Sequence, residues 1–524
     1  MRTFRALLAL LASLAVLALF AQPALAAPLV TDFNGDGFAD LAIGVPFEDV
    51  GAMSNAGAVS VLYGSSAGLT TADQLWTQDD TGTDTSESGD AFGSALATGD
   101  FDGDGFTDLA IGVPFEDVEA IGVAGAVNVL YGSPIGLTDD GAQFWTQDST
   151  DIEDSSEAND VYGSALAAGD FDGDGRSDLA IGVPFEDVDG TADAGAVSVL
   201  HGSSSGLTAT GDQFWHQDTS GILDTAEDAD LFGWSLAAAN FGASSQADLA
   251  VGVPGEDIGT VNGAGAVNVL YGSSSGLTTP DQFWHQDSAG VKGTAEDSDD
   301  FGWSLAAANF GESSQADLAV GAPGEDIGTV DGAGAVNVLY GASGGLTASG
   351  DQFWQQDSSG IKGTAEDGDE FGWSLAAANF GKSSPADLAI GVPCEDIGTV
   401  GNAGLVNVLY GASGGLTATG DQSWHQDASG VIDTAEDGDF FGRSLGAANF
   451  GKSSQADLAI GVPFEDVVAI DDAGAVNVLY GASGGLTASG DQFVHQDSSG
   501  IKDLAEMDDF FGWSLAPPGG GMLD

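Results

Sequence analysis

The sequence predicts an all-β protein, a seven-bladed β-propeller of four-stranded blades. Three observations lead to this prediction. The motif Asp-Leu-Ala-(Ile/Val)-Gly recurs seven times, with a period of 69 or 70 residues after the first copy. Each copy holds four short β-like segments separated by Gly- and Ser-rich turns, and one copy is divided between the two ends of the chain. Glycine makes up 81 of 524 residues without a collagen-like period, as in a turn-dense β protein.

The first 26 residues have the pattern of a cleavable export signal. Arg2 and Arg5 precede an apolar stretch, and Ala24-Leu25-Ala26 is a small-residue cleavage motif. The apolar stretch is short for a retained membrane anchor, and no later segment is apolar enough to span a bilayer. We expect residues 1–26 to be a signal peptide and residues 27–524 to form the propeller, either secreted or held at the cell surface.

Each repeat contains four expected strands, which we call A to D. In one copy they cover Phe232–Ala237, Asp248–Val253, Gly265–Gly272 and Asp281–Gln286. Strand C alternates apolar and polar side chains, as a half-buried strand does. Because no repeat shows helical spacing of apolar residues, a helical solenoid is excluded.

The two ends of the chain complement each other. The first copy begins at Asp32 and lacks strand A, whereas the last copy supplies only a strand A, Phe511–Ala516. Pairing this C-terminal strand with the N-terminal B, C and D strands would complete the seventh blade and remove an exposed sheet edge. We therefore expect six whole blades and one shared blade in a closed, monomeric ring.

The nine-residue loop between strands A and B predicts Ca²⁺ binding in three copies. Side-chain oxygens at positions 1, 3, 5 and 9, a main-chain carbonyl at position 7 and Gly at position 6 suit a hard cation held by a short loop. Phe38, Phe106 and Arg176 occupy position 7 and would contribute carbonyl oxygens. The predicted ligands are Asp32, Asn34, Asp36, Phe38 and Asp40; Asp100, Asp102, Asp104, Phe106 and Asp108; and Asp170, Asp172, Asp174, Arg176 and Asp178.

These loops differ from an EF-hand, because position 12 is Ile43, Ile111 or Ile181 inside an expected strand instead of a bidentate acid. Mg²⁺ is disfavoured because it tolerates an irregular cage of protein oxygens poorly. We predict three Ca²⁺ ions, with the Asn34 site weakest because it has one charge fewer. Acidic turns that only remain hydrated are the alternative interpretation.

The other four A–B loops keep the length but lose the ligands. Asn240–Asp248 has Gly at position 3 and Ser at position 5, and the loops ending at Asp317, Asp387 and Asp457 follow the same pattern. With one carboxylate each, they are not expected to bind Ca²⁺ tightly. Hydrogen bonds from backbone amides to Asn, Ser and Asp side chains would hold these turns.

Three features together resemble the FG-GAP repeats of the integrin α-chain propeller. They are Phe-Gly at the start of strand A, the Asp-x-Asp-x-Asp-Gly loop, and Gly-Val-Pro or Gly-Ala-Pro after strand B, as in Gly321–Pro323. The resemblance implies Ca²⁺ loops on a lower face and partner-binding loops on an upper face. Similar repeats occur in phosphatidylinositol-glycan-specific phospholipase D, in a fungal lectin and in secreted bacterial proteins.

The expected upper face is acidic in every blade. Each B–C turn carries Glu-Asp, from Glu48-Asp49 to Glu465-Asp466, and each D–A connection ends with an Asp, such as Asp230, two residues before the aromatic residue of strand A. Because these acids recur in all copies, we interpret them as caps for turn amides. Their summed field would also favour cationic or Ca²⁺-bridged partners, and adaptation to high salt is a further interpretation.

Two sets of tryptophans recur. The D-strand set predicts packing between blades, whereas the A-strand set, interrupted by Ser94, Ser164 and Arg443, is interpreted as channel packing or as a stacking surface for sugars. The first set is Trp76, Trp145, Trp215, Trp284, Trp354 and Trp424, with Val494 in the last copy, and the second is Trp234, Trp303, Trp373 and Trp513. Thr or Gln replaces the His that follows the D-strand position in three copies, which argues against zinc ligation there.

Charge and motifs exclude several functions. A net charge of −72, from 81 acidic and 9 basic residues, disfavours nucleic acids and anionic membranes. The single cysteine, Cys394, excludes an internal disulfide framework and is interpreted as a tolerated substitution. We find no serine-elbow, zinc-protease or phosphate-loop motif, and seven equivalent acid pairs indicate architecture, not one tuned acid and base.

We therefore expect a secreted, Ca²⁺-binding, integrin-α-like propeller that acts outside the cell, or at its surface, in adhesion to or recognition of a protein or glycan. It is not expected to be an enzyme. The alternatives are a calcium-dependent lectin and a hydrolase related to phosphatidylinositol-glycan-specific phospholipase D.

Overall fold

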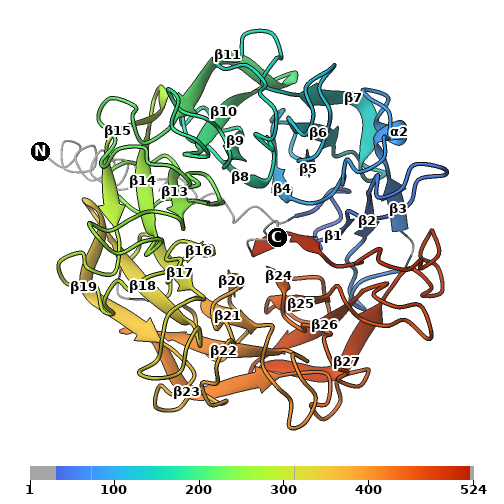
Figure 1. Ribbon diagram of the computed structural model, residues 1–524. Helices are drawn as coiled ribbons and strands as arrows, with labels where there is room; N and C mark the ends of the chain where they lie inside the picture. The colour runs from blue at the N-terminus through green and yellow to red at the C-terminus, as the bar shows by residue number, and fades with distance from the viewer. Residues whose placement is uncertain (1–30, 72, 312, 520–524) are drawn as a thin grey trace, which may run out of the picture.

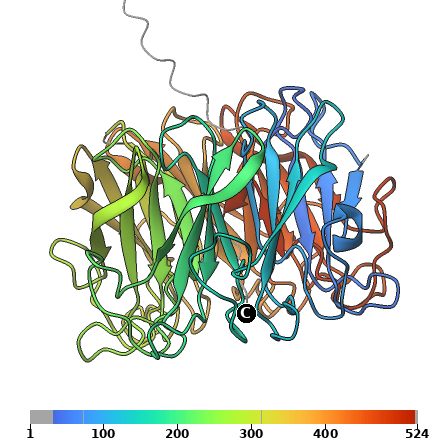
Figure 2. The ribbon, with the colours of Figure 1, turned by 90° about the horizontal axis from the view of Figure 1, so that it is seen from above.

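A computed structural model describes residues 31–71, 73–311 and 313–519. The expected signal peptide, residues 1–26, lies outside the described residues. Within them, seven antiparallel sheets are arranged radially in a ring (Figure 1), and each contains a full set of four blade strands. Edge-on, the strands run between two rims of loops (Figure 2). The predicted all-β, seven-bladed propeller is confirmed.

Strand A is innermost in each blade and strand D outermost, because the A strands contact one another around the ring. The A strands, in blade order 1 to 7, are β28 (Ser514–Ala516), β4 (Leu96–Gly99), β8 (Ala165–Gly169), β12 (Ser235–Ala239), β16 (Leu305–Ala308), β20 (Leu375–Ala378) and β24 (Ser444–Ala448). The B strands are β1 (Leu41–Val45), β5 (Asp108–Val113), β9 (Asp178–Val183), β13 (Asp248–Val253), β17 (Asp317–Ala322), β21 (Asp387–Val392) and β25 (Asp457–Val462).

The outer half of each blade is a hairpin of strands C and D. The C strands are β2 (Ala58–Leu62), β6 (Ala126–Tyr131), β10 (Ala196–Ser203), β14 (Ala266–Ser273), β18 (Ala335–Ala342), β22 (Leu405–Ala412) and β26 (Ala475–Ala482). The D strands are β3 (Asp73–Trp76), β7 (Thr138–Trp145), β11 (Gly206–Trp215), β15 (Gly276–Trp284), β19 (Gly345–Trp354), β23 (Gly415–Trp424) and β27 (Gly485–Val494). A single helical turn, α2 (Gln78–Thr81), follows β3.

In blade 4 strand B matches its predicted bounds and strand C is shifted by one residue, whereas strands A and D differ by more. Strand A of blade 4 begins at Ser235 and not at Phe232, because Gly233 has φ +96° and the chain turns there. The turn buries Phe232 completely, and a Cβ on Gly233 would lie 2.4 Å from the carbonyl oxygen of Ala196. Strand D begins earlier than predicted, at Gly276, because strands C and D pair on both sides of a register shift.

The C-terminal strand closes the ring as predicted. β28 pairs antiparallel with β1, with Ile43 opposite Leu515, so blade 1 combines the two ends of the described chain. The backbone then continues into β29 (Pro518–Gly519), which pairs with β24 and adds a fifth strand to blade 7. This extension, which was not predicted, places the last described residues against the innermost strands, because β29 also contacts β20, β28 and β4.

The hydrophobic core lies between neighbouring blades. Trp215 of blade 3, for example, packs in one cluster with Leu249 and Val251 of blade 4. This contact confirms the predicted packing role of the D-strand tryptophans. Small side chains from the A strands, such as Ala167 and Ala237, line a central cavity. No helix within the described residues is long and apolar enough to cross a membrane.

Candidate metal centre

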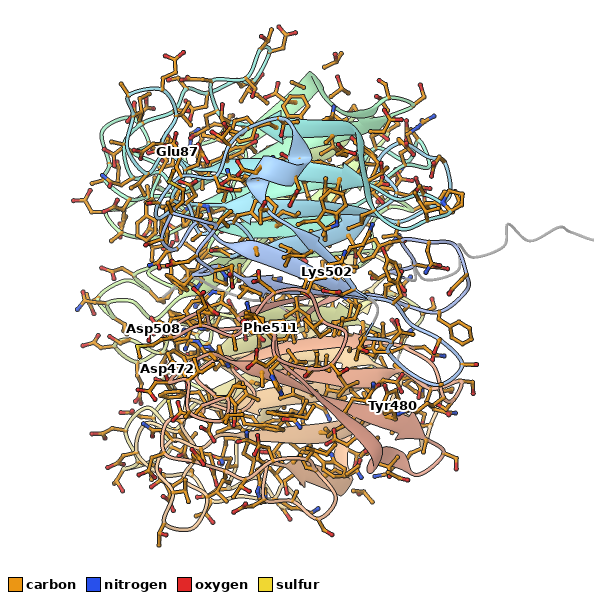
Figure 3. All side chains as sticks on the ribbon, turned by 90° about the vertical axis from the view of Figure 1, so that its right-hand side faces the viewer. Glu87, Asp472, Tyr480, Lys502, Asp508 and Phe511 are labelled. Carbon is orange, nitrogen blue, oxygen red and sulfur yellow. The ribbon has the colours of Figure 1, made fainter. Side chains whose placement is uncertain are left out.

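The A–B loops and the C–D hairpins lie on one rim of the ring, the lower face, and the B–C turns and D–A connections lie on the other, the upper face. Figure 3 shows this division: Glu87, Asp472 and Asp508 lie along one side, and Tyr480, at the end of strand C, lies toward the other. The predicted Ca²⁺ loops therefore share the lower face.

Backbone amides shape the acidic loops. In the second loop, the Asp100 carboxylate accepts hydrogen bonds from the amides of Gly103, Asp104 and Gly105, at 2.7, 3.1 and 3.1 Å. Asp102 accepts from the Asp104 amide at 2.9 Å. These bonds turn the chain so that side-chain oxygens from alternate positions converge. The first and third loops are held in the same way, by Asp32 and Asp170.

The Asp at position 9 has a structural role in every blade, whether or not the loop is acidic. One carboxylate oxygen of Asp108 accepts from the Phe101 amide at 2.8 Å, and the other accepts from the amide of Gly132, directly after strand C, at 2.9 Å. Burial raises the pKa of Asp108 to about 8. Asp40, Asp178, Asp248, Asp317, Asp387 and Asp457 each make the two equivalent hydrogen bonds.

The donor sets of the second and third loops fit a hard cation. Carboxylate oxygens of Asp100, Asp102 and Asp108 lie within 4.8 Å of one another. In the third loop, oxygens of Asp170, Asp172 and Asp174 converge within the same limit, although the Arg176 guanidinium pairs with Asp174 at 2.8 Å. Converging carboxylates of this kind are the ligands that Ca²⁺ takes in proteins.

The first loop has the same hydrogen-bond pattern, with an amide in place of one carboxylate. The Asn34 side-chain oxygen accepts from the Asp36 amide at 2.9 Å, as Asp102 does for Asp104 in the second loop. The loop therefore presents its oxygens in the same order with one charge fewer. The ranking of this site as the weakest of three stays a prediction.

The four loops that lack the acids are held by neutral side chains, as predicted. In blade 4 the Asn240 side chain accepts from the Gly242 amide at 3.0 Å and donates to the Ser244 carbonyl at 3.1 Å. The loops at Asn309, Asn379 and Asn449 repeat both bonds. In these loops the two hydrogen bonds of the Asn side-chain amide hold the turn, in place of converging carboxylates.

All seven loops are linked around the lower face. The position 8 amide of each loop donates to the position 1 carbonyl of the preceding blade, as in Ser177 to Asp100 at 2.9 Å. The last link, from Ala39 to Asn449 at 3.0 Å, joins blade 1 to blade 7. The Phe106 ring also lies against the first loop, because a Cβ on Gly35 would be 2.6 Å from a ring carbon.

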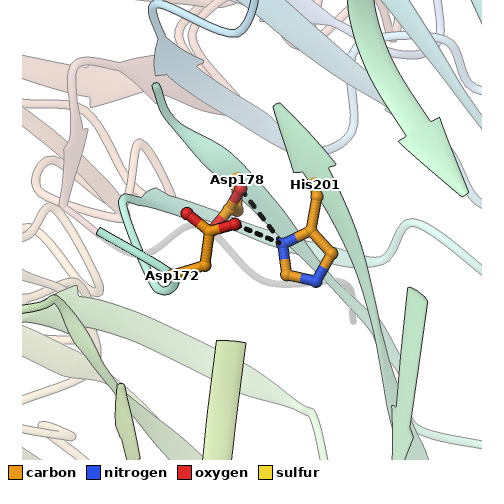
Figure 4. A group of neighbouring side chains, drawn as sticks. All are labelled: Asp172, Asp178 and His201. Atoms are coloured by element: carbon orange, nitrogen blue, oxygen red, sulfur yellow. Dashed lines mark ion pairs between the residues drawn. The ribbon is translucent and has the colours of Figure 1, made fainter. Parts of the chain in front are cut away.

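One residue that sequence reasoning missed lies beside the third loop. His201 of β10 places Nδ1 3.3 Å from Asp178 Oδ1 and 3.9 Å from Asp172 Oδ2 (Figure 4). The neighbouring Asp178 carboxylate raises the pKa of the imidazole. Comparison of the C strands would have found this residue, because Tyr occupies the position in the other six blades: Tyr63, Tyr131, Tyr271, Tyr340, Tyr410 and Tyr480.

The four histidines at the start of the D–A connections differ from His201 in the direction of their pKa shifts and in their lack of neighbouring ligand groups. Burial lowers the pKa of His216, His285, His425 and His495, which favours the neutral ring. Among the described residues, none of these four belongs to a cluster of three converging metal-ligating side chains.

The acid pairs of the upper face hold the architecture together. Gln78, at the end of blade 1, donates to Glu116 of blade 2 at 2.7 Å, and the Asp117 carboxylate caps the Val123 amide at 2.8 Å. The equivalent Gln–Glu bond links every neighbouring pair of blades: Gln147–Glu186, Gln217–Glu256, Gln286–Glu325, Gln356–Glu395, Gln426–Glu465 and Gln496–Glu48. In the D–A connections, Asp160 accepts from the Glu157 amide at 2.6 Å. The predicted capping role is confirmed.

The A-strand aromatics form an arc where the upper face meets the central channel. The ring centroids of Trp234 and Trp303 are 5.0 Å apart, and those of Trp303 and Trp373 are 4.8 Å apart. The Arg443 guanidinium lies 5.0 Å from the Trp373 ring and 4.8 Å from the Trp513 ring, so it continues the stack between them. We call these five residues the aromatic arc.

We call the upper end of the central channel the mouth. The residue at the mouth that precedes Phe-Gly, or Tyr-Gly in blade 3, differs between blades, although it has positive φ in all seven. It is Ala91, Val161, Leu231, Asp300, Glu370, Phe440 and Phe510 in blade order from 2 through 7 to 1. Burial raises the pKa of Asp300 to about 7, and the Cys394 thiol donates to Glu370 at 3.1 Å. Burial also raises the pKa of Cys394, which makes this thiol a poor nucleophile at neutral pH and agrees with its interpretation as a tolerated substitution.

Comparison with known proteins supports the repeat assignment. The FG-GAP repeat family matches residues 24–62, 92–130 and 162–200, and each segment contains one of the acidic loops. Three of the seven blades of this propeller therefore carry the FG-GAP repeat. Integrin alpha-3 of Mus musculus is 33% identical over 184 residues, which are 34% of this chain and 16% of the integrin. Phosphatidylinositol-glycan-specific phospholipase D of Bos taurus is 33% identical over 178 residues, 33% of this chain and 20% of the phospholipase.

The matched region is thus a small part of each of those relatives. Among solved structures, the periplasmic gluconolactonase of Pseudomonas aeruginosa aligns with a TM-score of 0.45 and 12% identity, over 87% of this chain and 96% of that one.

Proposed function

We propose that this FG-GAP propeller is a secreted or surface-held recognition module, stabilised by Ca²⁺, that binds an extracellular protein or glycan at the mouth of its upper face. The similarity of about a third of this chain to integrin alpha-3 supports an adhesive role. Residues 1–26 would direct export and be removed from the mature protein. The role proposed is binding and not catalysis, because the repeated acid pairs are engaged in hydrogen bonds that fix turns and blades.

The observation that carries the proposal is the loss of sevenfold symmetry at the mouth. The scaffold bonds recur in every blade, whereas the mouth presents the aromatic arc on one side and Ser94 and Ser164 on the other. Half-buried Asp300 and Glu370 neighbour the arc, because their backbone carbonyls accept hydrogen bonds from the amides of Trp303 and Trp373 at 2.9 and 3.0 Å. A repeat protein that needed these positions only for packing would have no reason to vary them, whereas a ligand site requires particular groups at particular blades.

Ca²⁺ has a supporting role in this proposal. Asp32, Asn34 and Asp36 would hold one ion, with Asp40 and the Phe38 carbonyl, and the second and third loops would each hold another through their equivalent residues. A bound cation would neutralise crowded carboxylates and fix three adjacent loops of the lower face. It would not contact a ligand bound at the upper mouth.

The test is a glycan array and a cell-surface pull-down with residues 27–524, each in millimolar Ca²⁺ and again in chelator. Trp303→Ser and Trp373→Ser are informative variants, because Ser occupies this position in blades 2 and 3 and the fold tolerates it there. We expect a ligand retained by the native chain and lost by both variants. Retention by both variants would reject the arc as the site.

The outcomes also separate the alternatives. Glycan hits that disappear in chelator would identify a calcium-dependent lectin, and capture of a surface protein with a blank array would identify an adhesin. Similarity to the bovine phospholipase suggests one enzymatic control, release of phosphatidylinositol-glycan-anchored proteins from membranes. Release by the native chain at catalytic concentrations would overturn the binding role.

A further inference from the structure

The third acidic loop differs from the other two because an imidazole faces it. We propose that Asp172, Asp178 and His201 form a site for a first-row transition-metal ion such as Zn²⁺, which would compete with Ca²⁺ for Asp172 and Asp178 of the third loop. This site lies on the lower face, away from the proposed binding surface of the upper face.

The distances between the three side chains suit such an ion. Nδ1 of His201 lies 3.3 Å from Asp178 Oδ1 and 3.9 Å from Asp172 Oδ2, and all three ligand atoms lie within 4.8 Å of one another. Tetrahedral Zn²⁺ with bonds of roughly 2.0–2.2 Å to nitrogen and oxygen places neighbouring ligand atoms about 3.3 Å apart. Small side-chain adjustments would complete the coordination.

The orientation of the imidazole leaves its coordinating lone pair directed at the acids. Nε2 lies 3.1 Å from the carbonyl oxygen of Gly211, which can only accept, so this nitrogen carries the proton. In the neutral ring Nδ1 is then unprotonated, and it faces two carboxylates. His201 is only 9% exposed, and its Nδ1 is buried with no hydrogen-bond partner. A proton or a metal cation at Nδ1 would remove the repulsion between its lone pair and the two carboxylates.

The surroundings orient the ligands as in established metal sites. A metal-bound histidine usually donates its second ring N–H to a carbonyl or carboxylate, as His201 does to Gly211. Asp178 is fixed by the amides of Phe171 and Gly202, both at 2.9 Å, and each of its oxygens has a lone pair remaining. An open hollow lined by Asp172, His201 and Thr208 gives access and room for water ligands.

Ligand chemistry distinguishes this site from the Ca²⁺ loops. Ca²⁺ takes oxygen ligands, whereas imidazole suits Zn²⁺ and its neighbours in the first transition row. Blade 2 has the same acids at Asp102 and Asp108, but there Tyr131 bonds to Gln143 at 2.5 Å. Substitution of Tyr by His in one blade thus turns a structural contact into a nitrogen ligand.

The experiment is calorimetric titration of residues 27–524 with Zn²⁺, first free of Ca²⁺ and then in 1 mM Ca²⁺. The Ca²⁺ concentration is roughly the dissociation constant of extracellular Ca²⁺-binding modules. Free of Ca²⁺, we expect the native chain to bind one Zn²⁺ that His201→Tyr binds at least about tenfold more weakly. In 1 mM Ca²⁺ the native chain should bind this Zn²⁺ more weakly, because the two ions compete for Asp172 and Asp178. His201→Tyr restores the residue of the other six blades, so it should fold, and an unchanged Ca²⁺ titration and melting temperature would show that it has.

The reciprocal variant is Tyr131→His, which should add a second Zn²⁺ site in blade 2. Identical Zn²⁺ isotherms for the native chain and His201→Tyr would overturn the proposal and assign His201 to an imidazolium–Asp178 ion pair. If Tyr131→His does not fold, the comparison between the native chain and His201→Tyr still decides the question.

Discussion

Closure of the ring through β28 makes the C-terminal strand essential for stability, and Leu515→Ala tests this. Leu515 is 4% exposed and packs in the cluster that contains Leu41 and Ile43, residues more than 470 positions away in sequence. Leu→Ala at a buried site costs about 2–5 kcal/mol, through the lost transfer free energy and the remaining cavity. Domains commonly have about 5–15 kcal/mol of total stability, so this loss is large.

The assay is equilibrium urea unfolding at fixed Ca²⁺, followed by tryptophan fluorescence. The matched control is Leu305→Ala, the equivalent position of β16 in blade 5, where the side chain is 3% exposed and the chain is continuous. The two variants should lose similar free energies of unfolding. If Leu305→Ala loses about 2–5 kcal/mol and Leu515→Ala loses less than about 0.5, β28 does not close the ring in solution.

Three further predictions concern the charged groups. Calorimetric Ca²⁺ titration should give three sites, and Asn34→Asp should tighten the weakest because it adds a ligand charge; an unchanged or weaker site would contradict the charge argument. Burial raises the pKa of Glu256 to about 9, so the folded state binds a proton that the unfolded state releases above its ordinary pKa. In chelator at fixed ionic strength, the melting temperature should therefore fall as pH rises from about 5 to 9, and Glu256→Gln should reduce that fall; a rise would refute the assignment. Asp248→Ala leaves the buried amides of Phe241 and Gly272 unpaired, which should cost about 2–6 kcal/mol in urea unfolding, and a loss under about 0.5 would show that other groups satisfy them.

The repeat pattern predicts the fold well because each blade repeats one set of local interactions. The unpaired strand A at Phe511–Ala516 was sufficient to predict the closure that β28 and β1 show. Strand boundaries were less predictable, since the positive φ of Gly233 is a property of the packed turn and is not visible in the Phe-Gly motif. β29 was not predicted, because its pairing with β24 depends on the shape of the closed ring.

The acidic loops show where sequence reasoning about a site reaches its limit. Spacing alone identified the converging oxygens of Asp100, Asp102 and Asp108. It could not show that the Asp at position 9 also accepts hydrogen bonds from two backbone amides in every blade, including the blades whose loops lack the other acids. That double role explains why the carboxylate of Asp248 persists in a loop that has lost its other acids. His201 was missed because its partners are about 20 to 30 residues away in sequence and meet it only through the pairing of β9 with β10.

The distribution of special residues around the ring suggests a division of labour between its faces. The acidic loops occupy blades 1 to 3 on the lower face, whereas the aromatic arc occupies blades 4 to 7 and blade 1 on the upper face. Blade 1 belongs to both sets, and it is also the blade closed without a covalent connection. Its loop contacts blade 7 through the Ala39–Asn449 bond, and its strand A carries Trp513 at the end of the arc. A cation in the first loop would therefore stabilise the blade in which the two ends of the described chain meet. The same blade positions Trp513, so metal binding on the lower face would help to fix the aromatic arc on the upper face.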